Sequence, residues 1–520
     1  MPGKDQRIVV IGIDSADYHV IQALLKLGSL PNLATLVGRQ FRKLKSTIPP
    51  NTAPSWTSMF TGVNPGKHGV FYFKSLDDGK LLSSVDVKSP YLWEMLGTES
   101  KSIVVNVPLT YPVHHIHGVM ISGLHATKAE PRSVFPTTLI PSVKSDYIFD
   151  IWDFEWASSL EIDSTRAYEA LLEGDSSRTN FFLSLLSREK WSFASLVLTS
   201  LDRVQHSFWD EGEKNPDTGL TKKVEGAYKF TDELLGRLGN ALMAYDDLSL
   251  IVTSDHGFED KRHLIYPNAC FAKNGLLTPR VSSSIIDRTV SDVYREMLKV
   301  LPTALAVWMG RTARPIFNRA LSRSAEISPI DHNATSAYCY PYGLVRIPKT
   351  KGTVPIKEQT LNEVTKKAIE TIEKELRINQ VTGARVMTGS QIYQGEFIGL
   401  APDLVIAPID GAEYLTDVFV PDNVVTPLGD HSMDGIFLTN RLLSDVVEDF
   451  RVWDVAATIV SLMGFEIPVE FDGKCVVKTQ KYEIMKPLSL QPSKRNPKDS
   501  SYSKEEGDDI ERRLKQLGYV

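Results

Sequence analysis

Short apolar runs alternate with longer amphipathic stretches along the first half of the chain. The runs are continuous and rich in Val and Ile, which is typical of strands buried on both faces of a parallel sheet. They cover residues 8–13, 102–107, 118–123, 192–200 and 248–254. Helical periodicity separates them, over residues 17–38, 165–189 and 223–245. This order predicts an α/β fold with a doubly wound, mostly parallel sheet flanked by helices.

The pattern changes in the second half of the chain. Residues 260–385 lose the alternation and mix basic with aromatic residues, so we expect an inserted region that covers the core. Strand character returns at 403–407, a polar loop follows at 429–435, and an apolar helix covers 454–463. The core is therefore expected to resume after the insertion.

These changes divide the chain into four expected segments. The tail begins rich in Pro, Ser and Lys, as a linker does, and ends in a charged helix over 503–517. The segments are a first part of the core (1–259), an inserted cap region (260–385), a second part of the core (386–485) and the tail (486–520).

A proline-rich loop leads into a short predicted helix. Pro49 and Pro50 keep the approach extended, Pro54 is tolerated in a first helical turn, and Gly62 suits the helix end. The loop delivers the hydroxyl of Thr52 to the start of this helix. Free N–H groups and the helix dipole make such a position suitable for a phosphate or another anion. Locally, the sequence leaves open that Thr52 only caps the helix.

Composition limits the classes of partner and the compartment that we expect for the protein. The 520-residue chain has a formal net charge of -6, which gives no reason to expect binding of a nucleic-acid polymer. Its three cysteines are far apart and form neither a metal motif nor a disulfide framework, which fits a reducing compartment. The apolar run at 8–13 is too short for a signal peptide or a membrane span. We therefore expect a cytoplasmic protein without a membrane span, and its oligomeric state stays open.

Carboxylates and imidazoles gather where the predicted strands end. Asp202 and His206 are four residues apart, so on a helical turn they share one face and can converge on one ion. A solvated Asp–His pair is the alternative. The remaining carboxylates and imidazoles follow predicted strands or lie in the polar loop: Asp14, Asp255, His256 and His431. In open α/β sheets functional groups collect at this edge, although Asp14 is equally suited to cap a helix and the Asp255–His256 pair to form an ordinary turn.

Five segments that contain these residues resemble, in order, the alkaline phosphatase superfamily. The closest branch is the type I phosphodiesterase/nucleotide pyrophosphatase group. The segments read VVIGIDSAD, PPNTAPSWTSMFTGVNPGKHGV, TSLDRVQHSFWD, IVTSDHGF and GDHSMDGIF. Each is weak alone, but five in the family's order are a specific signal. APDLVIAP and the ending Leu517-Gly518-Tyr519 also look like a bacterial and archaeal subgroup of predicted phosphohydrolases or mutases.

The resemblance implies a role for each residue. Thr52 would attack phosphorus, and water would then hydrolyse the phosphothreonine intermediate. One divalent ion, usually zinc, would be held by Asp14, Asp255 and His256, or would share them with its neighbour, with the Thr52 oxygen beside it. The second ion would be held by Asp202, His206 and His431. Mixed imidazole and carboxylate ligands suit zinc, and also manganese or iron. Two ions about 4 Å apart can stabilise both the attacking and the leaving oxygen.

One departure from the family concerns the substrate phosphate. Nucleotide pyrophosphatases usually carry an Asn shortly after the His-Gly pair, where it binds a phosphate oxygen. Here the pair is followed by the aromatic run Phe71–Phe73, which is more often core than a base-stacking platform. The missing donor is expected to be replaced by Asn51, Lys67 or a residue of the cap region. The resemblance alone therefore does not imply that the substrate is a nucleotide.

The sequence thus favours a phosphodiesterase-type phosphoric ester hydrolase that acts on a small-molecule phosphoester. A phosphomonoesterase or phosphomutase on the same scaffold is the first alternative, because a fold does not fix a substrate. A metal-stabilised binding protein without turnover is the alternative from another class.

Overall fold

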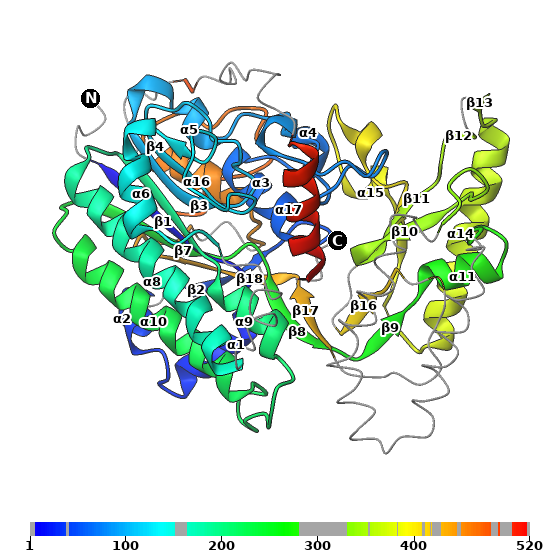
Figure 1. Cartoon of the computed structure of the whole chain (residues 1–520), viewed down its shortest axis with the longest axis horizontal. Helices are drawn as coiled ribbons and strands as arrows, with labels where there is room; N and C mark the ends of the chain where they lie inside the picture. The colour runs from blue at the N-terminus through cyan, green and yellow to red at the C-terminus, as the bar shows by residue number, and fades with distance from the viewer. Residues whose placement is uncertain are drawn as a thin grey trace.

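The larger part of the molecule is built on an eight-stranded sheet (Figure 1). All of its strands run in one direction except β18 and β5, which are antiparallel to their neighbours. The order across the sheet is β2 (Phe41–Lys45), β18 (Asp434–Thr439), β7 (Leu248–Thr253), β1 (Arg7–Ile13), β6 (Phe193–Leu198), β3 (Ser102–Val107), β4 (Gly118–Ser122) and β5 (Val134–Phe135). The expected doubly wound, mostly parallel sheet is confirmed.

The structure is a computed structural model, and part of the chain lies outside its description. Most of the expected linker, and residues 280–329 of the expected insertion, are among the residues left out. The described residues are 6–37, 41–150, 164–279, 330–351, 354–381, 383–407, 411–416, 418, 428–444, 449–479, 487–488 and 502–516.

Strand β1 shows why the apolar runs are continuous. Ile8 and Val10 belong to the hydrophobic core on one face of the sheet, whereas Val9 and Ile11 belong to the core on the other face. Because helices cover both faces, successive residues are all buried, and the polar alternation of a half-exposed strand is absent.

Two layers of helices cover the sheet. One core includes residues of α1 (Tyr18–Lys26), α2 (Pro31–Val37), α6 (Ile140–Asp146), α8 (Ser164–Arg188), α9 (Ser200–Phe208) and α10 (Lys222–Leu242). The other includes residues of α3 (Thr52–Thr61), α5 (Leu92–Met95), α16 (Asp454–Leu462) and α17 (Lys504–Gln516). Figure 1 shows α8 and α10 on one side of the sheet and α3 and α16 on the other. Shorter helical turns complete this part: α4 (Pro65–His68), η1 (Ser84–Asp86), η2 (Gly97–Glu99) and η3 (Thr137–Leu139).

The smaller part of the molecule has its own antiparallel sheet and its own core. The strand order is β10 (Tyr338–Tyr340), β11 (Leu344–Arg346), β15 (Leu404–Ile406) and β14 (Val386–Thr388). A hairpin and five helical segments accompany the sheet: β12 (Thr350–Lys351), β13 (Val354–Pro355), α11 (Pro267–Lys273), η4 (Pro341–Gly343), α14 (Glu358–Ile378), α15 (Gly389–Ile392) and η5 (Ile398–Leu400).

The smaller sheet includes residues on both sides of the expected segment boundary at residue 385. The strand expected at 403–407 is present, but it pairs with β11 and β14 and not with the eight-stranded sheet. The expected end of the insertion at residue 385 therefore falls inside the smaller sheet.

Two pairs of strands join the two parts. Strand β8 (Gly257–Lys261) is antiparallel to β17 (Leu428–Ser432), and β9 (His263–Ile265) is parallel to β16 (Ala412–Tyr414). The expectation of a polar loop at 429–435 is wrong, because most of that stretch lies in β17 and β18. Figure 1 shows these strands running from the larger part towards the smaller one.

The two parts also pack directly on each other. Phe71 and Tyr72 lie in a hydrophobic cluster with residues of the smaller part, which agrees with the expectation that this aromatic run is core. The Tyr393 hydroxyl donates to the Ile48 carbonyl at 2.7 Å, and the Arg346 guanidinium pairs with Asp77. The contact combines apolar burial with directional bonds.

The C-terminal helix packs on the larger part. Ile510 and Leu514 of α17 are buried in the core beside α3 and α16, and Glu506 pairs with Arg132 at 2.9 Å. The charged helix expected at 503–517 is therefore found within one residue of its predicted bounds. Among the described residues, no helix is long and apolar enough to cross a membrane.

Candidate active site

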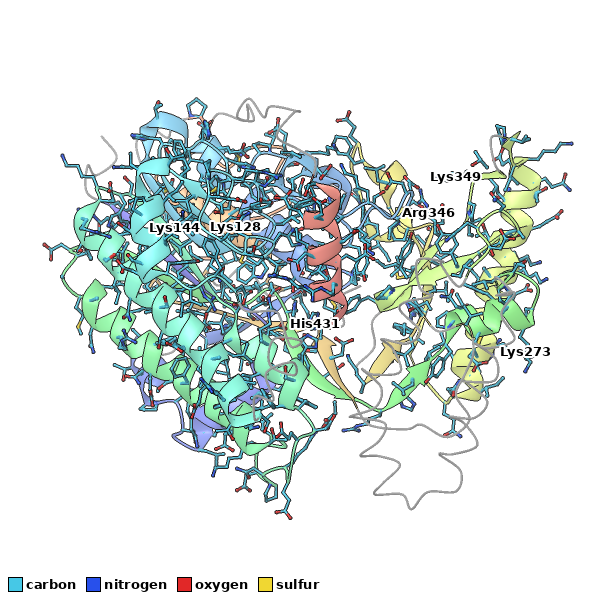
Figure 2. All side chains as sticks on the ribbon, in the orientation of Figure 1. Lys128, Lys144, Lys273, Arg346, Lys349 and His431 are labelled. Carbon is cyan, nitrogen blue, oxygen red and sulfur yellow. The ribbon has the colours of Figure 1, made fainter. Side chains whose placement is uncertain are left out.

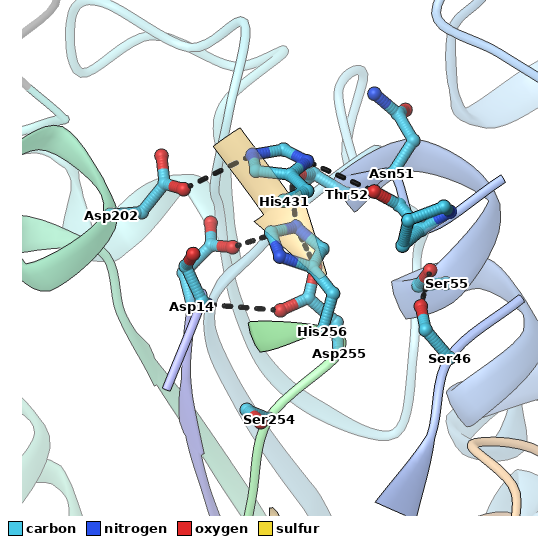
Figure 3. A network of polar contacts seen from close by, with 12 residues as sticks. Asp14, Ser46, Asn51, Thr52, Ser55, Asp202, Ser254, Asp255, His256 and His431 are labelled. Atoms are coloured by element: carbon cyan, nitrogen blue, oxygen red, sulfur yellow. Dashed lines mark hydrogen bonds and ion pairs between the residues drawn. The ribbon is translucent and has the colours of Figure 1, made fainter. Parts of the chain in front are cut away.

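Seven of the side chains selected from the sequence meet at the carboxyl edge of the eight-stranded sheet. Parallel strands end at the same edge, so residues far apart in the chain converge there. Strands β1 and β7 are followed by ligand candidates, β17 contains one, and α3 and α9 begin at this edge. Figure 3 shows six of the seven: Asp14, Thr52, Asp202, Asp255, His256 and His431.

The first group comprises Asp14, Asp255 and His256, all buried. The His256 Nε2 atom lies 3.0 Å from Asp255 Oδ2 and 3.8 Å from Asp14 Oδ1. One ligand atom from each residue lies within 4.8 Å of the others. Such spacing allows one ion to contact all three.

The carboxyl group of Asp14 lies in a buried environment that disfavours its negative charge. Burial, together with the charges of Asp255 and Asp202, raises the pKa of Asp14 well above its ordinary value. Neither carboxylate oxygen of Asp14 accepts a hydrogen bond. A buried carboxylate in this state needs a cation or a proton.

The second group comprises Asp202 and His206 of α9 with His431 of β17. Asp202 Oδ1 lies 3.4 Å from the Nε2 atoms of both histidines, which are 2.9 Å from each other. Asp202 and His206 share one face of α9, as their spacing predicts. Although burial acts to raise it, His206, His431 and the Arg203 guanidinium hold the pKa of Asp202 well below its ordinary value.

Backbone carbonyls fix the orientation of two imidazoles. The Nδ1–H of His256 donates to Gly257 O at 3.1 Å, and that of His431 donates to Pro50 O at 2.9 Å. Each bond leaves the Nε2 lone pair directed at its group, as in metal-ligating histidines. Burial, aided by the charge of His256, lowers the pKa of His431 to about 4, so its imidazole is neutral at neutral pH.

Thr52 stands at the first turn of α3, where the first group meets the helix. Its Oγ1 lies 3.3 Å from His256 Nε2. The helix is capped by Asn51, whose side chain accepts from Ala53 N at 3.3 Å. The alternative that Thr52 serves only as the helix cap is therefore wrong, because the preceding residue fills that position.

A close helix–strand contact places Thr52 beside Asp14. A Cβ atom at Gly12 of β1 would lie 2.3 Å from a ring carbon of Trp56 in α3. Only glycine at this position lets the indole lie against the strand. Gly62 then ends α3 in the left-handed conformation, at a φ of 74°.

The donor sets fit divalent cations. Imidazole and carboxylate ligands in groups of three suit zinc, and also manganese or iron, and they leave positions for a substrate or water. The rings of His256 and His431 stack with centroids 3.7 Å apart, so the two groups adjoin. The oxygens of Asp14 without hydrogen bonds are the observation that most directly calls for a cation.

The two residues expected to contact phosphate are placed differently. Asn51 lies beside Thr52, and its buried amide nitrogen donates no hydrogen bond (Figure 3). The Lys67 ammonium instead bonds to Asp472 Oδ1 and to the Glu470 carbonyl, both at 2.7 Å. The structure does not bring Lys67 to the site, because Asp472 and the Glu470 carbonyl hold its ammonium group.

Two further residues contact the site. Arg203 is buried between Asp202 and Asp150, and Tyr342 of η4 stacks on His431 with ring centroids 5.6 Å apart. The sequence offered little signal for either. Adjacent helical residues do not normally face each other, and Tyr342 is one of several tyrosines in an irregular region.

The fold and these groups agree with the predicted resemblance to the alkaline phosphatase superfamily. A doubly wound sheet holds two clusters of carboxylate and imidazole ligands, with a helix-borne threonine beside them. More narrowly, the chain belongs to the type I phosphodiesterase/nucleotide pyrophosphatase family, whose model matches residues 8–434. No curated protein matches the chain.

Solved structures with this fold come from several enzymes. Phosphonoacetate hydrolase from Sinorhizobium meliloti 1021, in complex with phosphonoformate, superposes with a TM-score of 0.52 at 15% identity, over 87% of this chain and 94% of that one. Murine ectonucleotide pyrophosphatase/phosphodiesterase 5 gives 0.50 at 14% identity, over 89% and 96%. A mutant of alkaline phosphatase PafA gives 0.50 at 13%, over 91% and 98%. The family match and the fold together indicate a phosphoester hydrolase.

Proposed function

We propose that the protein is a phosphodiesterase that uses Thr52 as its nucleophile and two divalent ions as cofactors. The position of the Thr52 hydroxyl carries the proposal. It lies 3.3 Å from a histidine of the first ligand group, at the N-terminus of a helix that another residue caps. Zinc is the ion best matched to the ligands, which combine histidine and aspartate.

The proposed reaction has two steps, attack by Thr52 on phosphorus and hydrolysis of the phosphothreonine. Ions at the two groups would favour ionisation of the Thr52 hydroxyl and offset negative charge on the phosphate. Thr52 Oγ1 bonds to phosphorus as the bond to one alcohol oxygen breaks. The hydroxyl proton passes to solvent, and the leaving alkoxide takes a proton from water. Water then attacks the phosphothreonine, Oγ1 leaves and regains a proton, and a phosphomonoester is released.

The charge of the site favours a diester over a monoester. Among the described residues, two cationic side chains contact the ligand residues, and both are engaged by acceptors. Arg203 pairs with Asp202 and Asp150, and Lys261 bonds to Glu259 and to the His431 carbonyl. A phosphodiester carries one negative charge and a monoester about two, so neutral donors suit the diester.

Thr52→Ala tests the nucleophile. We expect kcat for bis(p-nitrophenyl) phosphate to fall at least about 10³-fold, because the covalent route is lost. The matched control is Thr61→Ala in the last turn of α3, where the hydroxyl bonds to the Thr57 carbonyl. That variant should stay within about twofold of wild type. Turnover that survives in Thr52→Ala contradicts the covalent mechanism.

Metal content and substrate preference separate the alternatives. Elemental analysis after zinc or manganese loading should give two ions per chain, and fewer would contradict the two-metal site. Faster turnover of p-nitrophenyl phosphate than of the diester would indicate a phosphomonoesterase. Phosphoryl transfer to an acceptor in place of water would indicate a phosphomutase. Two bound ions without turnover of either ester, or of p-nitrophenyl sulfate, would favour a binding protein.

A further inference from the structure

Tyr342 reaches from the smaller part of the molecule to the ligand groups of the larger part. Its hydroxyl lies 3.5 Å from His431 Nδ1, and its ring stacks on that imidazole with an interplanar angle of 23°. The Tyr72 ring also lies next to Tyr342, with ring centroids 6.3 Å apart. Tyr342 is thus a side chain by which the smaller part contacts a ligand residue.

The backbone at Tyr342 is held in an unusual conformation. Its φ and ψ are 62° and 22°, in the left-handed region that a bulky residue rarely adopts. Packing fixes the turn: Leu344 is buried in the cluster between the two parts, and the Tyr340 hydroxyl bonds to Leu76 O at 3.3 Å. Conformations of this kind persist where the surrounding structure determines them, often at functional sites.

The hydroxyl hydrogen of Tyr342 is not required by His431. The His431 Nδ1–H already donates to the Pro50 carbonyl at 2.9 Å, so Nδ1 has no lone pair to offer. At 3.5 Å, the approach of the Tyr342 oxygen to Nδ1 is also too long for a strong bond. The phenol can therefore direct its hydrogen towards a bound anion.

Asn51 supplies a second donor beside the first. Its side-chain oxygen accepts from Ala53 N, whereas its amide nitrogen is fully buried and donates no hydrogen bond. The Asn51 side chain is a neighbour of the Tyr342 phenol. Buried amide donors without a partner are rare in folded proteins, and a ligand is one explanation.

We propose, on the basis of the proposed function, that Asn51 and Tyr342 form a clamp of two neutral donors for the non-bridging oxygens of the substrate phosphate. The pair takes the place of the Asn that the family usually carries after its His-Gly motif. Donors placed where charge develops stabilise the transition state more than the ground state. Because the smaller part carries Tyr342, the clamp is complete only while the two parts are packed together.

Tyr342→Phe tests the clamp, because it removes the hydroxyl and keeps the ring that stacks on His431. Calorimetry with inorganic phosphate on the zinc-loaded protein should show affinity about tenfold weaker, equivalent to ~1.4 kcal/mol. Asn51→Ala should weaken phosphate binding similarly. For the diester, kcat/KM should fall about 10²-fold in Tyr342→Phe. The matched control is Tyr340→Phe, whose hydroxyl bonds to Leu76 O away from the ligand groups, and it should bind phosphate as wild type does.

The outcomes distinguish the clamp from the proposed function. Unchanged phosphate affinity in Tyr342→Phe would overturn the clamp, whatever the enzyme hydrolyses. Loss of bound zinc in Tyr342→Phe would also overturn it, because the tyrosine would then act on His431 and not on the anion. If wild type turns over no diester but binds phosphate more tightly than Tyr342→Phe, the clamp stands and the phosphodiesterase proposal fails.

Discussion

At the scale of single residues, Arg203 supplies the positive charge next to the second ligand group. Its guanidinium is buried and bridges two carboxylates, Asp202 and Asp150, the latter at 2.9 Å. Charge-assisted bonds from one planar group to two carboxylates fix both of them in place. We infer that Arg203 positions Asp202 by holding its Oδ2 atom, while its Oδ1 atom faces the two histidines.

Arg203→Met should destabilise the metal-free protein by ~3–5 kcal/mol, because both carboxylates lose their buried counter-charge. Urea unfolding monitored by tryptophan fluorescence measures the change. Zinc should recover part of the loss, since an ion beside Asp202 compensates its charge. The control is Arg441→Met, which breaks a partly exposed pair with Asp247 and should cost at most ~1 kcal/mol. Equal losses in the two variants would contradict the structural role of Arg203.

At the scale of elements, α17 closes the core beside the helix that carries Thr52. Leu514 is fully buried and Ile510 nearly so, in the same cluster as Trp56 and Phe60 of α3. An isolated charged helix of this length is marginal in water, so its stability comes from this apolar face. Helix α17 is therefore part of the fold of the larger part.

Leu514→Ala should lower the free energy of unfolding of the larger part by ~2–5 kcal/mol, through lost apolar burial and the cavity left behind. The matched control is Leu442→Ala, because Leu442 is 66% exposed and its loss should change stability by less than about 0.5 kcal/mol. Chemical denaturation of both variants gives the comparison. A midpoint for Leu514→Ala equal to that of the control would show that α17 is not an integral part of the core.

The same scale shows what the sequence could and could not predict. Continuous runs such as Ile8–Ile13 were predictable because burial on both faces leaves a local pattern. A three-residue run such as Leu404–Ile406 looks alike in either sheet, so its partner strands could not be predicted. The polar residues of β17 gave no sign of a strand. Which of Asn51 and Thr52 caps α3 depends on backbone angles that the local sequence leaves open.

At the scale of the whole molecule, the candidate site lies where the two parts meet. Figure 2 shows His431 at the boundary of the larger part, with Arg346 and Lys349 on the smaller part across from it. Most ligand candidates could be found from the sequence because they follow a strand or have a helical spacing, and His431 could be found because it lies in one of the five family-like segments. Tyr342 could not, because only packing between the two parts brings it to His431.

Asp14 links the stability of the whole protein to pH and metal. Its pKa is raised in the folded state, chiefly by burial, so above the ordinary aspartate range the folded chain binds more protons than the unfolded one. Asp14 therefore makes the metal-free protein less stable as pH rises from about 4 through the folded-state pKa. His431, whose folded pKa is about 4, acts in the opposite direction only below the ordinary histidine value of about 6.5.

Zinc requires the ionised form of Asp14, so the increase in Tm that zinc produces should be larger at about pH 8 than at about pH 6. At about 100 times its Kd, one ion should add ~2.7 kcal/mol to the free energy of unfolding at the higher pH. Asp14→Asn is the decisive variant, because it should raise the Tm of the metal-free protein at about pH 8 and remove much of the pH dependence of the zinc effect. Scanning calorimetry with and without zinc measures both. A zinc effect that is equally large at both pH values in wild type would show that no carboxyl group with a raised pKa holds the ion.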